Sequence, residues 1–269
     1  MRRQSLFCLL AFIVSAVSTL QAQSSNAELV QISPPNLRRA APPSATASLE
    51  ELEKRGDELR VEKDYLDALD YYRAVLAKNP NSSDVHNKAG IAELLMQRYK
   101  EAGKEFERAI HLDRRYADAV NNLGVIDYEE KKYGKAIKQY EKALKLREGS
   151  ASFYSNMGAA YFGKKEFEKA TDAYATAIEL DPNILDRTSH NGISAQLPSP
   201  EDRARFDYII AKLCAKRGDS DRSLQYLRRA LEEGYKGIEN VYKDPEFAGV
   251  RNDARFTELM AARPPAIPE

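Results

Sequence analysis

Residues 151–184 read ASFYSNMGAAYFGKKEFEKATDAYATAIELDPNI, and this stretch decides the fold. Its Gly158 is the last of four glycines that follow one another at intervals of 34 residues, after Gly56, Gly90 and Gly124. A glycine inside a helix destabilises that helix by about 0.5–1 kcal/mol relative to alanine. Four glycines at one fixed interval therefore indicate a single packing contact that is used four times, as in a solenoid of helical repeats.

Small and aromatic residues repeat at the same interval. When the glycine is numbered as the eighth residue of each unit, the units start at Leu49, Ser83, Ala117 and Ala151. The twentieth residue is always alanine, and aromatic residues stand three positions before it and four after it. In residues 151–184 these are Phe167, Ala170 and Tyr174, with Ala177 three positions further on. Such spacing places them on one helix face, so each unit is predicted to be two amphipathic helices.

This pattern resembles that of the tetratricopeptide repeat (TPR) family, and the resemblance covers residues 49–182. It implies an all-α fold, a right-handed helix–turn–helix solenoid. The four clear TPR units are 49–82, 83–116, 117–150 and 151–184.

A divergent fifth unit is predicted at 204–237, after an irregular insert at 185–203 whose Ser199-Pro200 is typical of a helix start. Residues 238–262 resemble a closing segment that follows the last repeat in bacterial members of the family. This C-terminal helical cap would cover the open end of the solenoid with Phe247, Val250, Phe256 and Leu259. Residues 263–269 are predicted to be a disordered tail.

The N-terminus has the features of an export signal. Arg2 and Arg3 precede an apolar run of 15 residues, from Leu6 to Leu20, and small and polar residues follow it. Residues 1–22 are therefore predicted to be a signal peptide, because the run is short for a membrane-spanning helix. Residues 23–48 contain four prolines and many small residues, and are predicted to be a flexible tether. We expect an exported, periplasmic or secreted protein; an uncleaved N-terminal anchor is the alternative.

Composition and motifs argue against a catalytic, metal-binding or cofactor-binding function. The chain has 41 basic and 41 acidic residues, so its charge gives no case for binding nucleic acid or, after signal cleavage, a membrane. Its three histidines are not spaced as metal ligands, and no phosphate-binding loop or nucleophile motif is present. We predict no metal, no cofactor and no enzyme activity. The alternative is a catalytic site in the insert, built from Asp186, His190 and Ser194.

Partner binding is expected on one face of the first helices. In the family this inner face comes from the second, fifth, sixth, ninth, twelfth and thirteenth residues of each unit. The predicted groove residues are Asn87, Lys88, Ile91, Asn121, Asn122, Val125, Tyr128, Ser155, Asn156 and Phe162. Amide groups can donate to and accept from a peptide backbone, and the apolar side chains can bury those of a partner. The alternative is that the asparagines only order neighbouring helices.

Charge differs between the two ends of this face. The first unit contributes Glu50, Glu53, Lys54, Asp57 and Arg60, and the fifth contributes Arg205, Tyr208, Lys212 and Lys216. The first set is acidic overall and the second is basic, and this difference would fix the direction of a bound segment. Family members that bind the C-terminal carboxylate of cytosolic chaperones carry a clamp of lysine, asparagine and arginine. The corresponding places in this sequence hold no such clamp, so that subtype is excluded.

We therefore predict a non-catalytic scaffold or adaptor that binds a peptide or helix of a partner protein in the groove, with the cell envelope as its expected place. The alternatives are a self-associating homo-oligomer and a membrane-anchored accessory subunit of an envelope enzyme or secretion complex. On the groove hypothesis, Asn122→Ala with Asn156→Ala weakens partner binding and leaves the helical melting curve nearly intact.

Overall fold

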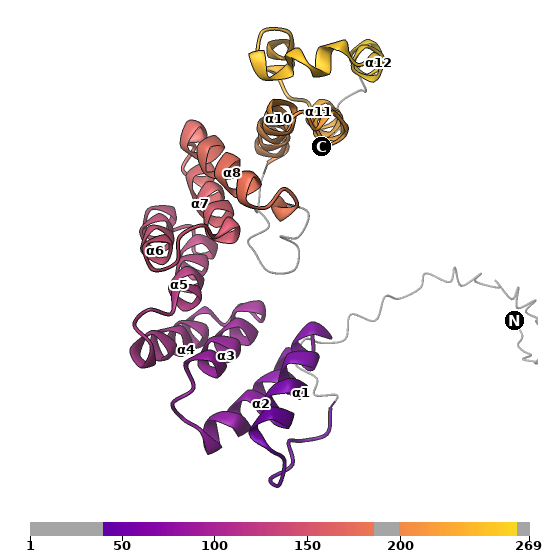
Figure 1. Cartoon of the computed structure of the whole chain (residues 1–269). Helices are drawn as coiled ribbons and strands as arrows, with labels where there is room; N and C mark the ends of the chain where they lie inside the picture. Colours follow the sequence, from indigo (N-terminus) through magenta and orange to yellow (C-terminus); the bar gives the residue numbers. More distant parts are fainter. Residues whose placement is uncertain (1–39, 186–198, 263–269) are drawn as a thin grey trace, which may run out of the picture. The chain divides into compact units, whose positions relative to one another are not determined.

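The structure is a computed structural model of the chain and describes residues 40–185 and 199–262. Eight helices form four successive pairs (Figure 1): α1 Leu49–Val61, α2 Tyr65–Lys78, α3 Ser83–Leu95, α4 Tyr99–Leu112, α5 Ala117–Glu129, α6 Tyr133–Leu146, α7 Ala151–Gly163 and α8 Phe167–Leu180. The all-α helix–turn–helix architecture predicted from the sequence is confirmed. The predicted signal peptide, the tail at 263–269 and most of the insert lie outside the described residues.

Each repeat glycine lies against an aromatic ring of the second helix in its pair. The contacts are Gly56 with Tyr72, Gly90 with Phe106, Gly124 with Tyr140 and Gly158 with Tyr174. A Cβ atom at any of these glycines would come within 2.5–3.0 Å of a ring atom. All four rings are buried. The glycines are therefore required because the rings occupy the space that a side chain would need.

The turn inside each pair also repeats. Its fifteenth-position residue has a positive φ, 67° at Lys63, 59° at Gln97, 60° at Lys131 and 62° at Lys165. The next N–H donates to the carbonyl five residues earlier, as from Asp64 to Leu59 (2.9 Å), which is the hydrogen bond of a Schellman cap. Gly218 (φ 76°) takes this place in the fifth unit, where glycine adopts the conformation without strain.

A segment before the first helix packs along α2. The contacts are the Ala40 N–H to Asp67 Oδ1 (3.1 Å), the Tyr71 hydroxyl to the Ala41 carbonyl (3.1 Å), and Lys78 Nζ to the carbonyls of Ala45 (3.0 Å) and Ala47 (2.5 Å). We call residues 40–47 the N-terminal strap. The sequence places them in a flexible tether, and the structure corrects this prediction because α2 holds their backbone.

The fifth pair consists of α10 Pro200–Lys216 and α11 Ser220–Glu232. The Ser199 side chain caps α10 by accepting the N–H of Asp202 (3.1 Å), so the helix begins four residues before the predicted unit start at Ala204. The contact with the fourth unit is aromatic. The Phe206 ring lies 5.4 Å from Tyr174 and 6.0 Å from Phe162, measured between ring centroids.

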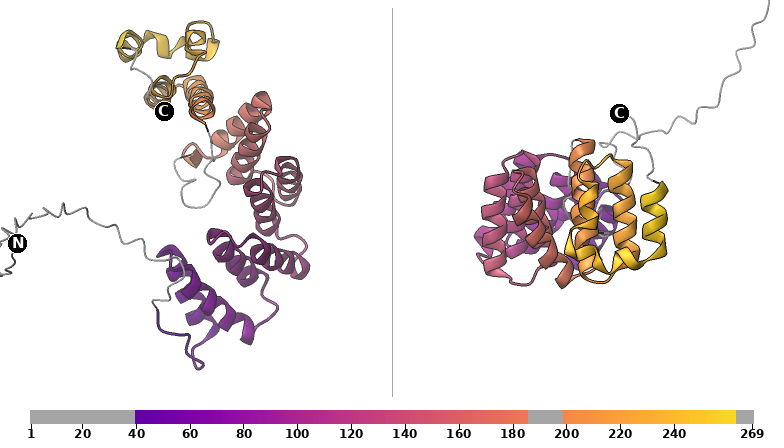
Figure 2. Two further views of the ribbon diagram at one scale, coloured as in Figure 1. Left: turned by 180° about the vertical axis from the view of Figure 1, so that it is seen from behind. Right: turned by 90° about the horizontal axis from the view of Figure 1, so that it is seen from above.

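The C-terminal segment continues the same core. It contains three short 3₁₀ helices, η1 Ile238–Tyr242, η2 Pro245–Ala248 and η3 Val250–Asn252, followed by α12 Ala254–Ala262. The four predicted cap residues, Phe247, Val250, Phe256 and Leu259, are buried. Tyr208 of α10 stacks on Tyr235 (4.4 Å) and packs against Phe247 (5.6 Å). Figure 2 shows α10, α11 and α12, coloured orange to yellow, side by side.

The glycine contact gives a matched pair of substitutions. We expect Gly124→Ala to lower the free energy of unfolding by about 1–3 kcal/mol, because its Cβ would lie 2.5 Å from the Tyr140 ring. Gly134 lies in α6 with nothing within 4 Å of its Cβ position, so Gly134→Ala should raise stability by about 0.5–1 kcal/mol. Urea unfolding measures both; equal changes of the same sign would contradict the packing role of Gly124.

Candidate functional site

The candidate site is the inner face, meaning the side chains at the six family positions on α1, α3, α5 and α7. Six of the ten predicted groove residues are buried: Asn87, Asn121, Tyr128, Ser155, Asn156 and Phe162. The other four are half-buried: Lys88, Ile91, Asn122 and Val125. The structure therefore leaves a much smaller accessible set than the sequence predicts.

The four asparagines form one chain of hydrogen bonds across three repeats. Asn156 donates to Asn121 (3.0 Å), Asn121 to Asn122 (3.2 Å) and Asn122 to Asn87 (2.9 Å). Two of these bonds join the sixth residue of one unit to the fifth residue of the unit before it. We call this chain the amide ladder. An amide both donates and accepts, so each member satisfies the next and the buried groups do not lack partners.

The ladder assigns these side chains a packing role in this structure. Asn156 is only 2 % exposed and its amide is committed to Asn121, so a partner could reach it only after the junction between α5 and α7 opened. Asn122 is half-buried and keeps an accessible part. Of the two sequence interpretations, the ordering of neighbouring helices is the one that these contacts favour, and partner binding by Asn122 stays a prediction.

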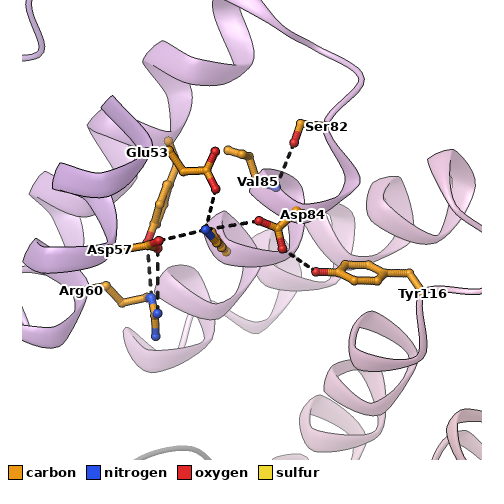
Figure 3. Close-up of polar contacts among 9 residues, drawn as sticks. Glu53, Asp57, Arg60, Ser82, Asp84, Val85 and Tyr116 are labelled. Carbon is orange, nitrogen blue, oxygen red and sulfur yellow. Dashed lines mark hydrogen bonds and ion pairs between the residues drawn. The ribbon is translucent and has the colours of Figure 1, made fainter. Parts of the chain in front are cut away.

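At the junction of the first two units, charged side chains take the positions that asparagines hold further along the chain. Lys88 Nζ lies 2.6 Å from Glu53, 2.8 Å from Asp57 and 3.2 Å from Asp84. Figure 3 shows the three carboxylates converging on one nitrogen, with Tyr116 donating to Asp84 (2.8 Å). Lys88 and Glu53 occupy the same sixth and fifth positions that asparagines occupy further along. We call this group the Lys88 cluster.

The Lys88 cluster is held in its charged form. Partial burial acts to lower the pKa of Lys88, but hydrogen bonds to Asp57 and Glu53 outweigh this effect, and the pKa is raised. Burial acts to raise the pKa of Asp84, but the hydrogen bond from Tyr116 and the charge of Lys88 prevail, and the pKa is lowered. The lysine is therefore neutralised within the protein and is not a free cation for an anionic ligand.

The aromatic residues at the twelfth position face the neighbouring helices. Tyr128 lies 5.4 Å from Tyr133, and Phe162 lies 5.1 Å from Phe167 and 6.0 Å from Phe206. Because both rings are buried in these contacts, they stabilise the packing of the repeats. They offer little surface to a partner.

The predicted basic end of the inner face is neutralised in part. Lys212 pairs with Asp244 (3.0 Å) and Glu246 (3.6 Å) of the C-terminal segment, and the Arg205 guanidinium lies 4.5 Å from the Phe167 ring centroid. Lys216 is exposed, so this end keeps part of its positive charge, and the expectation that opposite charges at the two ends orient a bound segment stays a prediction.

Two accessible residues are missing from the sequence prediction. Val61 and Leu95, at the thirteenth position of α1 and α3, are 76 % and 47 % exposed. The family pattern for the inner face includes the thirteenth position, so the sequence alone could have predicted that these two side chains lie on this face. Val61 borders a hollow on α1 that is otherwise lined by charged side chains: Glu50, Glu53, Lys54, Asp57, Glu58 and Glu62.

Metal-ligating side chains are dispersed along the described helices. Within residues 40–185 and 199–262, no three His, Cys, Asp or Glu side chains are grouped so that they could hold a metal ion. Cys214 is buried in the core shared by the fourth and fifth units. Asp186, His190 and Ser194 lie outside the described residues. No helix among those described is long and apolar enough to cross a membrane.

Comparisons with known proteins agree with the repeat architecture. Two family models described as "Tetratricopeptide repeat" match residues 53–119 and 151–184, and one described as "TPR repeat" matches residues 124–165. The sequence matches no curated protein.

Among solved structures, the chain is similar to pilF of Pseudomonas aeruginosa, with a TM-score of 0.52 and 19% identity over 79% of this chain and 96% of that one. It is also similar to the TPR protein TTC0263 of Thermus thermophilus, with a TM-score of 0.50 and 16% identity over 80% of this chain and 100% of that one. At these identities the likeness supports the fold alone.

The amide ladder predicts unequal effects for two asparagines. We expect Asn156→Ala to lower the free energy of unfolding by about 1–3 kcal/mol, because the buried side-chain oxygen of Asn121 loses its donor. This corrects the expectation that replacing Asn122 and Asn156 together leaves the melting curve nearly intact. Asn122→Ala removes two ladder bonds, but Asn122 is half-buried, so water can take the place of its amide beside Asn87 and Asn121 and the loss should be less than about 1 kcal/mol. Urea unfolding of each single variant tests this difference. Losses that are equal within error would show that the ladder does not stabilise the junction.

Proposed function

Because the repeats between residues 53 and 184 belong to the tetratricopeptide repeat family, we propose that this chain is a non-catalytic adaptor that binds a segment of a partner protein on its inner face. Proteins with these repeats are generally interaction scaffolds. The bound segment is an extended peptide or a helix, and its apolar side chains contact the middle of the face.

One observation carries this proposal. The ninth residues of α3 and α5, Ile91 and Val125, are half-buried, so each keeps part of its apolar surface accessible to a partner. The polar residues around them are satisfied by the amide ladder and the Lys88 cluster. Covering the two aliphatic side chains would remove apolar surface from water without leaving a buried polar group unpaired. Such a surface suits a protein partner better than a small polar ligand.

A binding experiment tests the adaptor. We expect a crosslinked pull-down of the native protein to recover a specific partner that is lost when Ile91 and Val125 are both replaced by Asp, because each carboxylate would be desolvated by the partner. Leu180→Asp is the matched control, since Leu180 is an exposed leucine on α8. Circular dichroism establishes that the variants fold.

Three outcomes of this pull-down differ in meaning. A partner retained by the double variant would place the interface elsewhere. Recovery of only the protein itself, at a discrete higher mass, would replace the adaptor with a self-associating oligomer. An effect of Leu180→Asp equal to that of the double variant would mean that neither result reports on the inner face.

We further propose that the protein is exported to the cell envelope. The support is the N-terminal sequence, in which Arg2 and Arg3 precede the apolar run from Leu6 to Leu20. N-terminal sequencing of the native protein tests this: we expect a start near Gln23 in the soluble exported fraction. A protein that keeps Met1 in the membrane fraction would be anchored, and one that keeps Met1 in the cytosol would refute export.

A further inference from the structure

Exposed aliphatic side chains on the inner face are concentrated in its first two repeats. Val61 and Leu95 occupy the thirteenth position of α1 and α3, and both are among the most exposed large apolar residues of the described chain. In α5 and α7 the same position holds Glu129 and Gly163. The Gly163 site is filled by a neighbouring ring, since its Cβ would lie 2.8 Å from Tyr133. The apolar exposure is therefore specific to α1 and α3.

The surroundings of Val61 are acidic. The hollow that it borders on α1 is lined by five carboxylates and one lysine. Within the part of the chain that the structure describes, Glu58 and Glu62 pair with Arg55, and these three side chains are 38–51 % exposed, so the attraction is screened by water. Lys88 binds Glu53 and Asp57, and Arg60 lies 3.9 Å from Asp57, so the surrounding cations offset part of the charge. The carboxylates still outnumber them, and a partner approaching Val61 meets a small net negative charge.

No part of the described chain covers this hollow. The N-terminal strap lies on α2, the other helix of the first pair, and its hydrogen bonds go to residues of α2. Glu53 and Asp57, which face α3 through Lys88, also line the hollow, so the hollow adjoins the inner face of the second unit. Val61 and Leu95 stand at the same position of the two successive repeats that Lys88 joins.

We infer that Val61, Leu95 and the carboxylates around them form the docking end of the groove, and that they select a partner segment in which aliphatic residues are flanked by lysine or arginine. The inference rests on the proposed function and names the chemistry of its partner. The aliphatic residues cover Val61 and Leu95. The long stems of lysine or arginine extend over this apolar surface while their cationic groups reach Asp57, Glu58 and Glu62.

The charges around the hollow also disfavour an acidic ligand. A segment that ends in a free carboxylate, or is rich in acids, would be repelled by the hollow. Lys88 is already bound by three carboxylates, and the one lysine that lines the hollow, Lys54, is outnumbered by five carboxylates. The docking end therefore discriminates by charge as well as by apolar contact.

Selection from a displayed library of random short peptides, with the whole chain as bait, tests the inference. We expect the enriched peptides to combine aliphatic residues with lysine or arginine. A synthetic copy of the most enriched peptide, labelled with a fluorophore, then serves as the probe for anisotropy titrations. Its affinity should fall as ionic strength rises, because part of the attraction is between charges near the surface.

Amino-acid substitutions show where on the protein the labelled peptide binds. Val61→Asp combined with Leu95→Asp should weaken binding about tenfold or more, since the buried apolar contact is lost. Leu180→Asp, at a leucine of 45 % exposure against 47 % for Leu95, should leave the affinity unchanged. Glu58→Lys combined with Glu62→Lys should weaken binding at low salt and have little effect at high salt, which a purely structural role of these residues would not produce.

The outcomes separate this inference from the function on which it rests. One outcome would refute the docking end but keep the groove. The selected peptides would lose affinity when Ile91 and Val125 are replaced, but they would be acidic, or their affinity would not change in the Val61 and Leu95 variant. Enrichment of no peptide over a bait-free control would count against both. If the bait instead binds a second copy of itself, sedimentation shows a mass that rises with concentration, and the external partner is refuted.

Discussion

The close contact between a glycine and an aromatic ring brings together the two helices of each of the first four repeats. With the ring against the glycine backbone, a side chain at this place on the first helix is sterically excluded, and the same contact holds the two helices together in all four pairs. The turn between them then has one workable geometry, with a left-handed residue at the fifteenth position even where that residue is lysine or glutamine. The helix pair is thus a nearly fixed unit, and variation is confined to the surfaces between units.

Those surfaces differ from one junction to the next. The fifth residue of one unit meets the sixth residue of the next as Glu53 with Lys88, then as Asn87 with Asn122, then as Asn121 with Asn156. Ser155 and Ile209 hold the corresponding places at the last junction, where Phe206 packs against the rings of Phe162 and Tyr174 instead. The same pair of positions therefore carries an ionic contact at the first junction and amide contacts at the next two, whereas aromatic packing at other positions joins the last two units. The side chains that remain accessible at each junction determine what the inner face offers a partner.

The sequence predicts the fold well because the glycines and rings constrain the backbone of each unit from within. It predicts the accessible groove poorly because exposure at the fifth and sixth positions depends on the neighbouring unit. Asn121 and Asn156 look like groove residues until the partner amide across the junction is known. The N-terminal strap has another reason to escape prediction. Tyr71 and Lys78 bind its backbone carbonyls, so its side chains carry no pattern that records the contact. Val61 and Leu95, by contrast, could be read from the repeat pattern.

The alternation of junction chemistry bears on how such a gene can change. Repeats of equal length invite unequal recombination, which deletes or duplicates one whole unit while keeping the reading frame. If the unit from 83 to 116 were lost, Glu53 would face Asn122, and a carboxylate would replace the amide that now accepts from it. If it were duplicated, Asn87 would face a second copy of Lys88, which would keep Asp84 of its own unit but lack Glu53 and Asp57. The units have the same fold, but each makes different contacts with the next unit. Loss or duplication of one unit would therefore mismatch a junction, which favours keeping their order unchanged.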